Sequence, residues 1–229
     1  MTKTLLIVIG LLAALLMAAG IMFNPVSIAR RQLYDKDPSI RIRATYVLYK
    51  NGDKESIPEI AKLLQDNDAK VRNHTMLSLA LLGDKESIPE IRKMLDADKS
   101  IKCTVIGALG ELGDKESIPT IRKILNDSSH SNESIDDTLT YTSIYALSKL
   151  HDSELKPMLK EFLNNKYSKI RQSAVYAAGE LGSKESIPRI KELLNDPEDY
   201  YGDVLAEAKS ALQKLGVPAE EIEQAKEKK

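Results

Sequence analysis

The chain has 229 residues, of which 42% are hydrophobic and 29% are charged, so it is long and apolar enough to fold around a continuous core. Its formal net charge of -1 argues against a protein that mainly binds the phosphate backbone of nucleic acid, because such proteins carry a basic excess. The only cysteine is Cys103, which excludes an internal disulfide and a metal site built from cysteines.

An apolar run stands near the amino terminus. Leu5–Phe23 has no charged residue, and a helix of this length approaches the ~30 Å thickness of the bilayer core. We interpret 1–24 as a single-pass transmembrane anchor, with a cleaved signal peptide as the alternative. A basic start at Lys3 favours an extracytoplasmic body, whereas the arginines after the run favour a body facing the cytoplasm. The predicted localisation is therefore the membrane, with the body extracytoplasmic; the alternatives are a secreted or periplasmic chain and a body facing the cytoplasm.

A repeated phrase organises the rest of the chain. Gly-Asp-Lys-Glu-Ser-Ile-Pro occurs at Gly52–Pro58, Gly83–Pro89 and Gly113–Pro119, with one change at Gly182–Pro188 and in degenerate form at His151–Pro157. Repetition at intervals of about 30–38 residues indicates stacked supersecondary units. The predicted units are 25–51, 52–82, 83–112, 113–150, 151–181 and 182–215, followed by a charged capping helix at 216–229.

Each unit has the pattern of a helical hairpin. In the unit 52–82, apolar residues of the first helix recur at helical spacing, and so do those of the second helix. Gly83 follows the second helix, where a glycine commonly ends a helix. Because one hairpin cannot bury its apolar face alone, the pattern predicts an all-α solenoid of about six stacked hairpins. The unit 113–150 is longer than the others, and we place its extra residues in a loop at 126–137.

A second motif opens the second helices. It reads Asp37-Pro-Ser-Ile-Arg41, Asp68-Ala-Lys-Val-Arg72 and Asp98-Lys-Ser-Ile-Lys102, and Arg171 keeps its end. Together with the Gly-Asp phrase, it resembles HEAT-like repeats of the phycobilisome-lyase type over about 25–215, as in a membrane-tethered bacterial HEAT-repeat protein. The resemblance implies that the aspartates and basic residues form a structural ladder between neighbouring repeats, through Asp37, Arg41, Asp68, Arg72, Asp98, Lys102 and Arg171.

Proteins of this repeat type include enzymes, enzyme subunits and scaffolds, so the fold alone does not define an activity. The iron-binding hydroxylase of similar fold uses His-Glu pairs, but His74, His130 and His151 are followed by Thr, Ser and Asp. Cys103 has no histidine nearby in the sequence that could activate it. We therefore expect no catalytic residue, no cofactor and no metal.

The second helices carry unusual residues opposite their buried stripe. At 100° per residue, two positions of each helix point away from the core, and in related arrays second helices line the concave surface. Tyrosine and apolar side chains there are typical of a protein-binding strip, although ordinary surface tyrosines are the alternative reading. The candidate strip is Tyr46, Leu77, Tyr141, Tyr145, Gln172 and Tyr176. The basic residues nearby would suit an acidic partner; they are Arg41, Arg43, Arg72, Lys102 and Arg171.

The sequence thus predicts a non-catalytic interaction scaffold or adaptor, tethered at the membrane, whose concave helix face binds a protein and not nucleic acid. The alternative is a regulatory or chaperone subunit of an enzyme, or a lyase-like HEAT-repeat enzyme. A spacer whose faces bind nothing is a further alternative.

Overall fold

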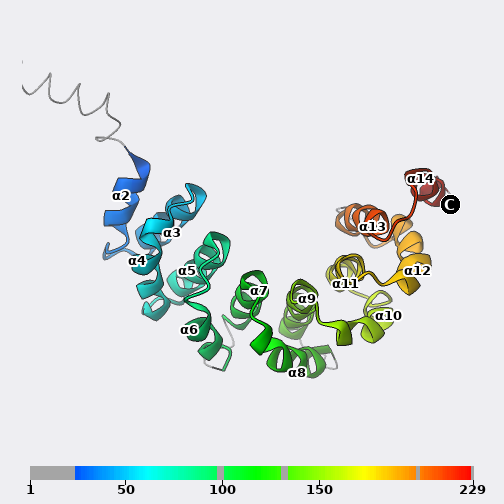
Figure 1. The fold of residues 1–229 in the computed structure, drawn as a ribbon, viewed down its shortest axis with the longest axis horizontal. Helices are drawn as coiled ribbons and strands as arrows, with labels where there is room; N and C mark the ends of the chain where they lie inside the picture. The colour runs from blue at the N-terminus through cyan, green and yellow to red at the C-terminus, as the bar shows by residue number, and fades with distance from the viewer. Residues whose placement is uncertain (1–23, 97–100, 130–133, 200–201, 228–229) are drawn as a thin grey trace, which may run out of the picture. The chain divides into compact units, whose positions relative to one another are not determined.

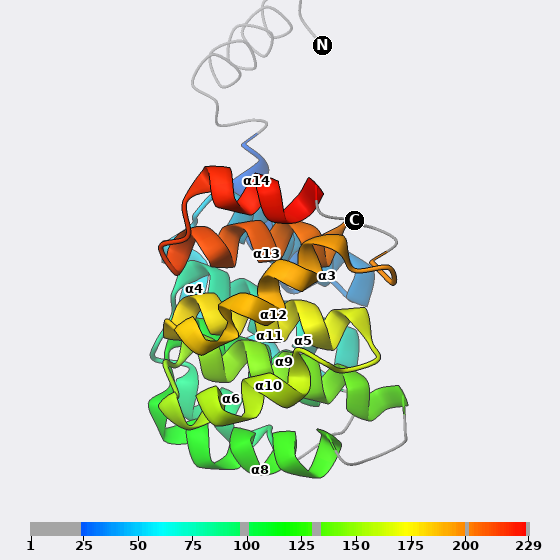
Figure 2. The same ribbon diagram turned by 90° about the vertical axis from the view of Figure 1, so that its right-hand side faces the viewer.

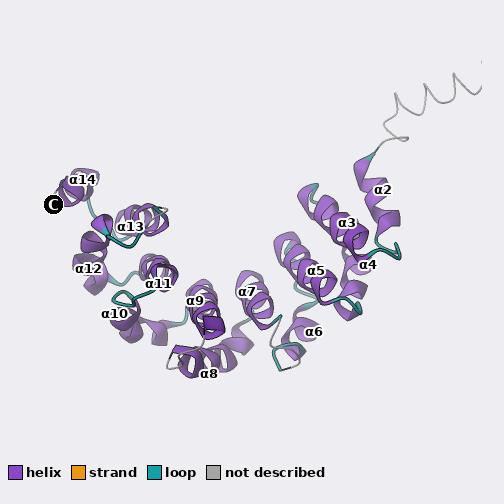
Figure 3. Cartoon of the chain, turned by 180° about the vertical axis from the view of Figure 1, so that it is seen from behind, coloured by secondary structure: helices purple, strands orange, loops and turns teal. Residues whose placement is uncertain are grey.

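The computed structural model describes residues 24–96, 101–129, 134–199 and 202–227. Over these residues the chain is built of helices joined by short turns, and no strand occurs among them (Figure 3). The all-α solenoid expected from the repeats is therefore confirmed. The chain divides into two compact units, with the boundary between Ser87 and Ile88.

In the first unit, α2 (Pro25–Gln32) packs on α3 (Pro38–Lys50), and α3 packs on α5 (Ala69–Leu82). The short helix α4 (Ile57–Lys62) packs on α5 and is flanked by 3-10 turns at Lys54–Ser56 and Leu63–Gln65. The first helix of this hairpin is therefore three short pieces instead of one continuous α-helix. Leu48, Ile60, Met76 and Leu79 are fully buried in the core of this unit.

The second unit repeats this hairpin (Figure 1). Its second helices pack in sequence, α7 on α9, α9 on α11 and α11 on α13, while α6, α8, α10 and α12 each pack on the second helix that follows. Figure 2 shows α8, α10 and α12 following one another beside this layer, with α14 after α13. The helices are α6 (Ile88–Lys93), α7 (Lys102–Leu112), α8 (Ile118–Ser129), α9 (Ser134–Lys149), α10 (Leu159–Phe162), α11 (Ser168–Leu181), α12 (Ile187–Glu192), α13 (Asp203–Lys214) and α14 (Ala219–Glu227).

The long repeat differs from its prediction. Residues 126–129, expected in a loop, form the last turn of α8, and α9 already begins at Ser134. The added residues therefore lengthen both helices of the hairpin. The 130–133 part of the predicted loop lies outside the described residues.

Local signals in the sequence determine where the helices begin and end. Asp37 and Asp68 are the N-caps of α3 and α5, and their carboxylates accept hydrogen bonds from Ser39 N and Lys70 N. Gly83 follows α5 in the left-handed conformation, with φ of 75°. In the degenerate fifth copy His151 takes this position with φ of 55°, where an L side chain is strained.

Two glycines bring the second helices of the second unit into close contact. A Cβ added to Gly110 of α7 would lie 2.8 Å from Ala146 Cα of α9, and one added to Gly179 of α11 would lie 3.1 Å from Ala211 Cα of α13. Only glycine at these positions allows such an approach without a backbone shift. The spacing between α7 and α9 and between α11 and α13 therefore depends on residues of minimal size.

Arginines of the second helices link successive turns. Nη1 of Arg41 donates to the carbonyls of Asp35 and Lys36, while its Nε donates to Asp66 Oδ2 at 2.8 Å. Arg171 repeats this geometry with Asp196 Oδ2 at 2.7 Å, and Nη1 of Arg72 likewise donates to the carbonyls of Asp66 and Asn67. The carboxylate bound by Arg41 or Arg171 thus belongs to the turn of the following hairpin.

This arrangement differs from the ladder expected for the aspartates of the motif. Asp37 and Asp68 cap their own helices, whereas the arginines bind aspartates that stand in the turn before the next second helix. Lys102 is the first residue of α7. Asp98 lies outside the described residues.

A second set of arginines binds the Asp and Glu of the repeated phrase in three of its five copies. Arg30 of α2, Arg92 of α6 and Arg122 of α8 each bind the aspartate and the glutamate that open the following hairpin. Those aspartates are buried to 7% exposure or less, so each arginine neutralises a desolvated carboxylate. The pairs are Arg30 with Asp53 and Glu55, Arg92 with Asp114 and Glu116, and Arg122 with Asp152 and Glu154.

The predicted membrane localisation is not supported. Within residues 24–96, 101–129, 134–199 and 202–227, no helix is both long enough and apolar enough to cross a bilayer. This finding corrects the assignment of a single-pass anchor with an extracytoplasmic body. The run Leu5–Phe23, on which that assignment depended, lies outside the described residues.

Candidate interaction groove

The six residues of the predicted strip lie in two places. Tyr46 of α3 and Leu77 of α5 belong to the first unit and are exposed to 49% and 45%. The Tyr46 ring meets Tyr49 edge-on at 5.3 Å between centroids. Tyr141, Tyr145, Gln172 and Tyr176 belong to the second unit, and the structure brings all four together.

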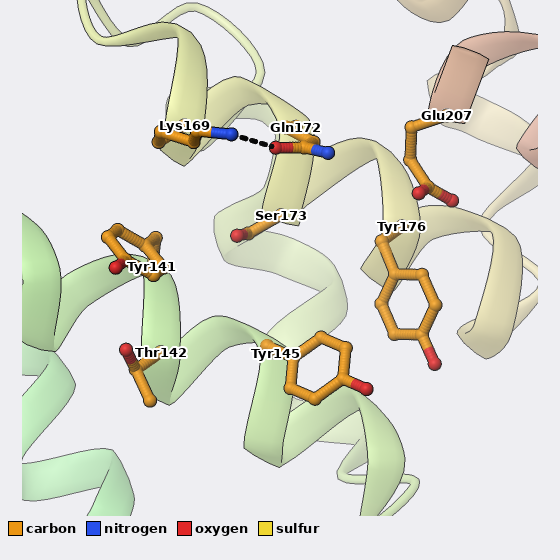
Figure 4. Close-up of a pocket in the computed structure, with 8 residues that line it drawn as sticks. All are labelled: Tyr141, Thr142, Tyr145, Lys169, Gln172, Ser173, Tyr176 and Glu207. Carbon is orange, nitrogen blue, oxygen red and sulfur yellow. Dashed lines mark hydrogen bonds between the residues drawn. The ribbon is translucent and has the colours of Figure 1, made fainter. Parts of the chain in front are cut away.

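These four residues line an open groove of about 390 Å³ between α9 and α11, bordered by α13 (Figure 4). Tyr141 and Tyr145 stand one helical turn apart on α9, and Gln172 and Tyr176 stand one turn apart on α11, so each pair faces the same side. We call this site the tyrosine groove; its lining is Tyr141, Thr142, Tyr145, Lys169, Gln172, Ser173, Tyr176 and Glu207.

Two stacked tyrosines form one end of the groove. The rings of Tyr145 and Tyr176 stack with their centroids 4.9 Å apart and their planes inclined by 28°. Tyr145 Oη donates a hydrogen bond of 2.6 Å to Glu111 Oε1 of α7, and Lys214 Nζ of α13 lies 5.3 Å from the Tyr176 centroid. Residues of four successive repeats thus fix the orientation of this ring pair.

The phenols of Tyr145 and Tyr176 have raised pKa values. Burial raises the pKa of Tyr145, and the hydrogen bond to the Glu111 carboxylate raises it further. Burial also raises the pKa of Tyr176, with the Glu180 carboxylate acting in the same direction. Neither hydroxyl is poised to act as a base, so the two rings offer contact area and hydrogen bonds to a ligand.

Ion pairs surround the groove. Lys149 Nζ lies 3.2 Å from Glu111 Oε2, and Lys214 Nζ lies 2.6 Å from Glu180 Oε1. Lys169 Nζ at the opposite end lies 2.6 Å from Asp203 Oδ2 and donates to Gln172 Oε1 at 3.2 Å (Figure 4). These lysines are therefore already matched by carboxylates of the chain.

The sequence did not point to Thr142, Lys169, Ser173 or Glu207 as groove residues. Ser173 and Thr142 follow Gln172 and Tyr141 directly, so a wider helical face would have included them. Glu207 sits one repeat further along, and only the close packing of α13 on α11 brings it to the groove.

Cys103 of α7 stands apart from any catalytic arrangement in the described structure. Its side chain is half-buried, and burial raises the pKa of its thiol. Among the described residues, no group of three or more His, Cys, Asp or Glu side chains is placed to hold a metal ion. His130 and Glu133 of the long repeat lie outside those residues.

Comparison with known proteins identifies the repeats. Residues 26–101 and 133–213 match HEAT repeats, and residues 101–127 match the PBS lyase HEAT-like repeat. The chain is thus a helical-repeat protein with an aromatic groove on its second helices. It belongs to the HEAT-repeat family.

Solved structures of similar fold come from several sources. A chain of the CpcE–CpcF complex of phycocyanin lyase from Nostoc sp. PCC7120 is 20% identical, with a TM-score of 0.60 over 88% of this chain and 80% of that one. An engineered protein is 17% identical, with a TM-score of 0.51 over 83% of this chain and 96% of its own. At these identities the similarity shows the fold alone. Comparison with curated protein sequences gives no match.

Proposed function

We propose that this HEAT-repeat protein is a non-catalytic interaction scaffold or adaptor, which binds a protein partner through the tyrosine groove of its second unit. The observation that supports it is the gathering of Tyr141, Tyr145 and Tyr176 in one open groove of about 390 Å³. Tyrosine is enriched at the energetic centres of protein interfaces because its ring gives a large contact area and its hydroxyl a hydrogen bond.

The rigidity of the groove also favours binding. The Tyr145–Tyr176 stack and the Tyr145–Glu111 hydrogen bond hold these side chains before a partner arrives. Ordering a free side chain at an interface costs about 0.5–1.5 kcal/mol, and a side chain that is already fixed avoids this cost. The groove is therefore preorganised for a partner side chain.

The test replaces Tyr141, Tyr145 and Tyr176 together by alanine. Full-length wild type and triple variant are used as baits in a cross-linked pull-down from extracts of the source cells. A matched control replaces Tyr34 and Tyr167 by alanine, because both are exposed, at 65% and 42%, and neither lines the groove. A protein captured by wild type and control but lost with the triple variant supports the proposal. Identical recoveries with all three baits would overturn it.

A second function is a regulatory or chaperone subunit of an enzyme, or a lyase-like enzyme. What supports it is the fold shared with a chain of a phycocyanin lyase complex. This alternative predicts that Cys103→Ser abolishes an activity of the purified chain, alone or with its partner, while the triple tyrosine variant still binds that partner.

A further inference from the structure

Glu207 is an acidic residue of the groove lining. Among the described residues, no hydrogen bond or ion pair involves the Glu207 carboxylate. Glu207 is partly buried, and it stands at the α13 border of the groove on the side where Tyr176 lies (Figure 4). Burial raises the pKa of its carboxyl, and the Glu180 carboxylate adds to this effect while Lys214 opposes it. An ionised Glu207 thus lacks the close cation that a desolvated carboxylate requires.

Among the described residues, the lysines around the groove form ion pairs with carboxylates other than Glu207, although Lys214 also acts on Glu207 electrostatically. Lys169, the only lysine or arginine among the described residues that line the groove, is bound to Asp203. Arg171, which the sequence placed beside the strip as a basic element, is buried at 4% exposure against Asp196. Arg41 of the first unit is held by Asp66 in the same way. Arg43, Arg72 and Lys102, the other basic residues expected beside the strip, do not line the tyrosine groove. Among the described residues, the charged group of the groove without an ion pair is therefore the Glu207 carboxylate.

We propose that the tyrosine groove receives an arginine side chain of the partner protein, with its guanidinium stacked against the tyrosine rings and paired with Glu207. This inference rests on the proposed function and adds the chemistry of the partner to it. The evidence for it is charge complementarity: aromatic faces attract cations, and the open carboxylate supplies the counter-charge.

Arginine fits this site better than lysine. Its guanidinium is planar, so it can stack on a ring face while its fork of N–H donors reaches a carboxylate. It is also more weakly hydrated than an ammonium group, so its transfer into a partly buried aromatic site costs less. The hydroxyl of Ser173 and the amide of Gln172 line the same groove and offer further polar contacts to the incoming chain.

The test uses dye-labelled, capped pentapeptides of four glycines around one central residue. The central residue is arginine, lysine or citrulline, which has the shape of arginine without its charge. Binding to the full-length chain at pH 7.5 is measured by fluorescence anisotropy. We expect the arginine peptide to bind about tenfold more tightly than the citrulline peptide, which corresponds to a cation–π contact strengthened by a counter-ion. Glu207→Gln should weaken the arginine peptide by a similar factor.

Glu220→Gln is the matched control, because Glu220 is exposed on α14 and the change removes the same charge. It should leave arginine binding unchanged, and circular dichroism checks that both variants keep their helical content. Equal affinity for arginine and citrulline, or an effect of Glu207→Gln no larger than that of Glu220→Gln, would overturn the inference.

The pull-down separates this inference from the proposed function. If the partner is lost with the triple tyrosine variant but captured fully by Glu207→Gln, the proposed function is supported. The inference that the groove receives a partner arginine is then wrong. If the triple variant keeps the partner, the proposed function fails and the partner arginine fails with it, even where the peptide binds.

Discussion

Tyr145 and Tyr176 stack across two neighbouring repeats, with their ring centroids 4.9 Å apart. They project from α9 and α11, the helices that also form the walls of the groove. The same contact therefore joins two repeats and shapes the candidate site. Because each hairpin of a solenoid is stabilised mainly by its neighbours, a contact of this kind contributes to both stability and binding.

A double-mutant cycle on this pair tests the coupling. Tyr145→Leu, Tyr176→Leu and the double variant are unfolded in urea, and the interaction term is taken from the four free energies of unfolding. We expect a coupling of about 0.5–1.5 kcal/mol, the usual value for a stacked aromatic pair. Tyr145→Leu combined with Tyr167→Leu is the control, and its coupling should be near zero because these rings form no pair in the described structure. Additive effects of Tyr145→Leu and Tyr176→Leu would contradict the prediction.

The part of the groove built on α9 and α11 could be predicted because it depends on helical periodicity alone. Tyr141, Tyr145, Gln172 and Tyr176 occupy equivalent positions on the outward face of successive second helices. The repeat phrase likewise predicted the hairpins, because glycine, proline and aspartate act locally on helix ends.

What the sequence did not reveal depends on distances between repeats. Glu207 reaches the groove because Gly179 lets α13 approach α11 closely. Arg41 binds Asp66, which is not an aspartate of the motif that opens the second helices. The short helices and 3-10 turns around Ile57–Lys62 also differ from the single helix that apolar spacing predicts. Periodicity identifies a face, whereas tertiary packing selects the residues that meet across it.

Because Gly110 lies in close contact with Ala146, we expect alanine substitutions at two glycines of α7 to have opposite effects on the free energy of unfolding. Gly110→Ala would place a Cβ 2.8 Å from the Ala146 backbone, so the helices must separate, at a cost of about 1–3 kcal/mol. A Cβ at Gly107 would meet only Thr142 Cγ2 at 4.0 Å, so Gly107→Ala should stabilise the helix by about 0.5–1 kcal/mol. Urea unfolding measures both effects. Equal effects of the two changes would show that α7 and α9 are not this close.

The buried ion pair of Arg171 predicts a large loss on its removal. Arg171 and Asp196 are exposed to only 4% and 5%, so Arg171→Gln leaves a desolvated carboxylate without its cation, at a cost of about 3–5 kcal/mol. Arg189→Gln in α12 is the control, because its partner Glu192 is 66% exposed, and the loss there should be about 0–1 kcal/mol. Chemical denaturation of the two variants gives the comparison. A small effect of Arg171→Gln would mean that water reaches Asp196.

Replacing His151 by glycine is expected to stabilise the fold. Its φ of 55° lies in the left-handed region, and glycine takes the equivalent place in the other copies of the phrase, as at Gly113 with φ of 78°. We expect His151→Gly to raise the free energy of unfolding by about 0.5–1 kcal/mol, because relief of the strain exceeds the added entropy of the unfolded chain. His151→Ala is the control and should give no gain, since alanine is strained there as well. Thermal unfolding at neutral pH distinguishes the two.

Glu207 predicts a pH dependence of stability. Burial and Glu180 raise the pKa of its carboxyl in the folded chain above the usual value of 4.5, with Lys214 opposing. The folded state therefore holds this proton more tightly than the unfolded state does. The resulting contribution to stability is fully present below pH 4.5 and is lost as the pH rises through the folded pKa. At neutral pH the ionised carboxylate destabilises the fold.

Glu207→Gln removes this dependence. Relative to wild type, the variant should gain stability as the pH rises from about 4 to 7 and keep a constant advantage above the folded pKa. Glu220→Gln is the control for the removal of one negative charge at an exposed position. Urea unfolding at a series of pH values measures both differences, and a difference for Glu207→Gln that does not change with pH would contradict the prediction. When an arginine peptide is bound in the groove, the stability advantage of Glu207→Gln over wild type above the folded pKa should disappear. The bound guanidinium then compensates the charge of the partly buried Glu207 carboxylate.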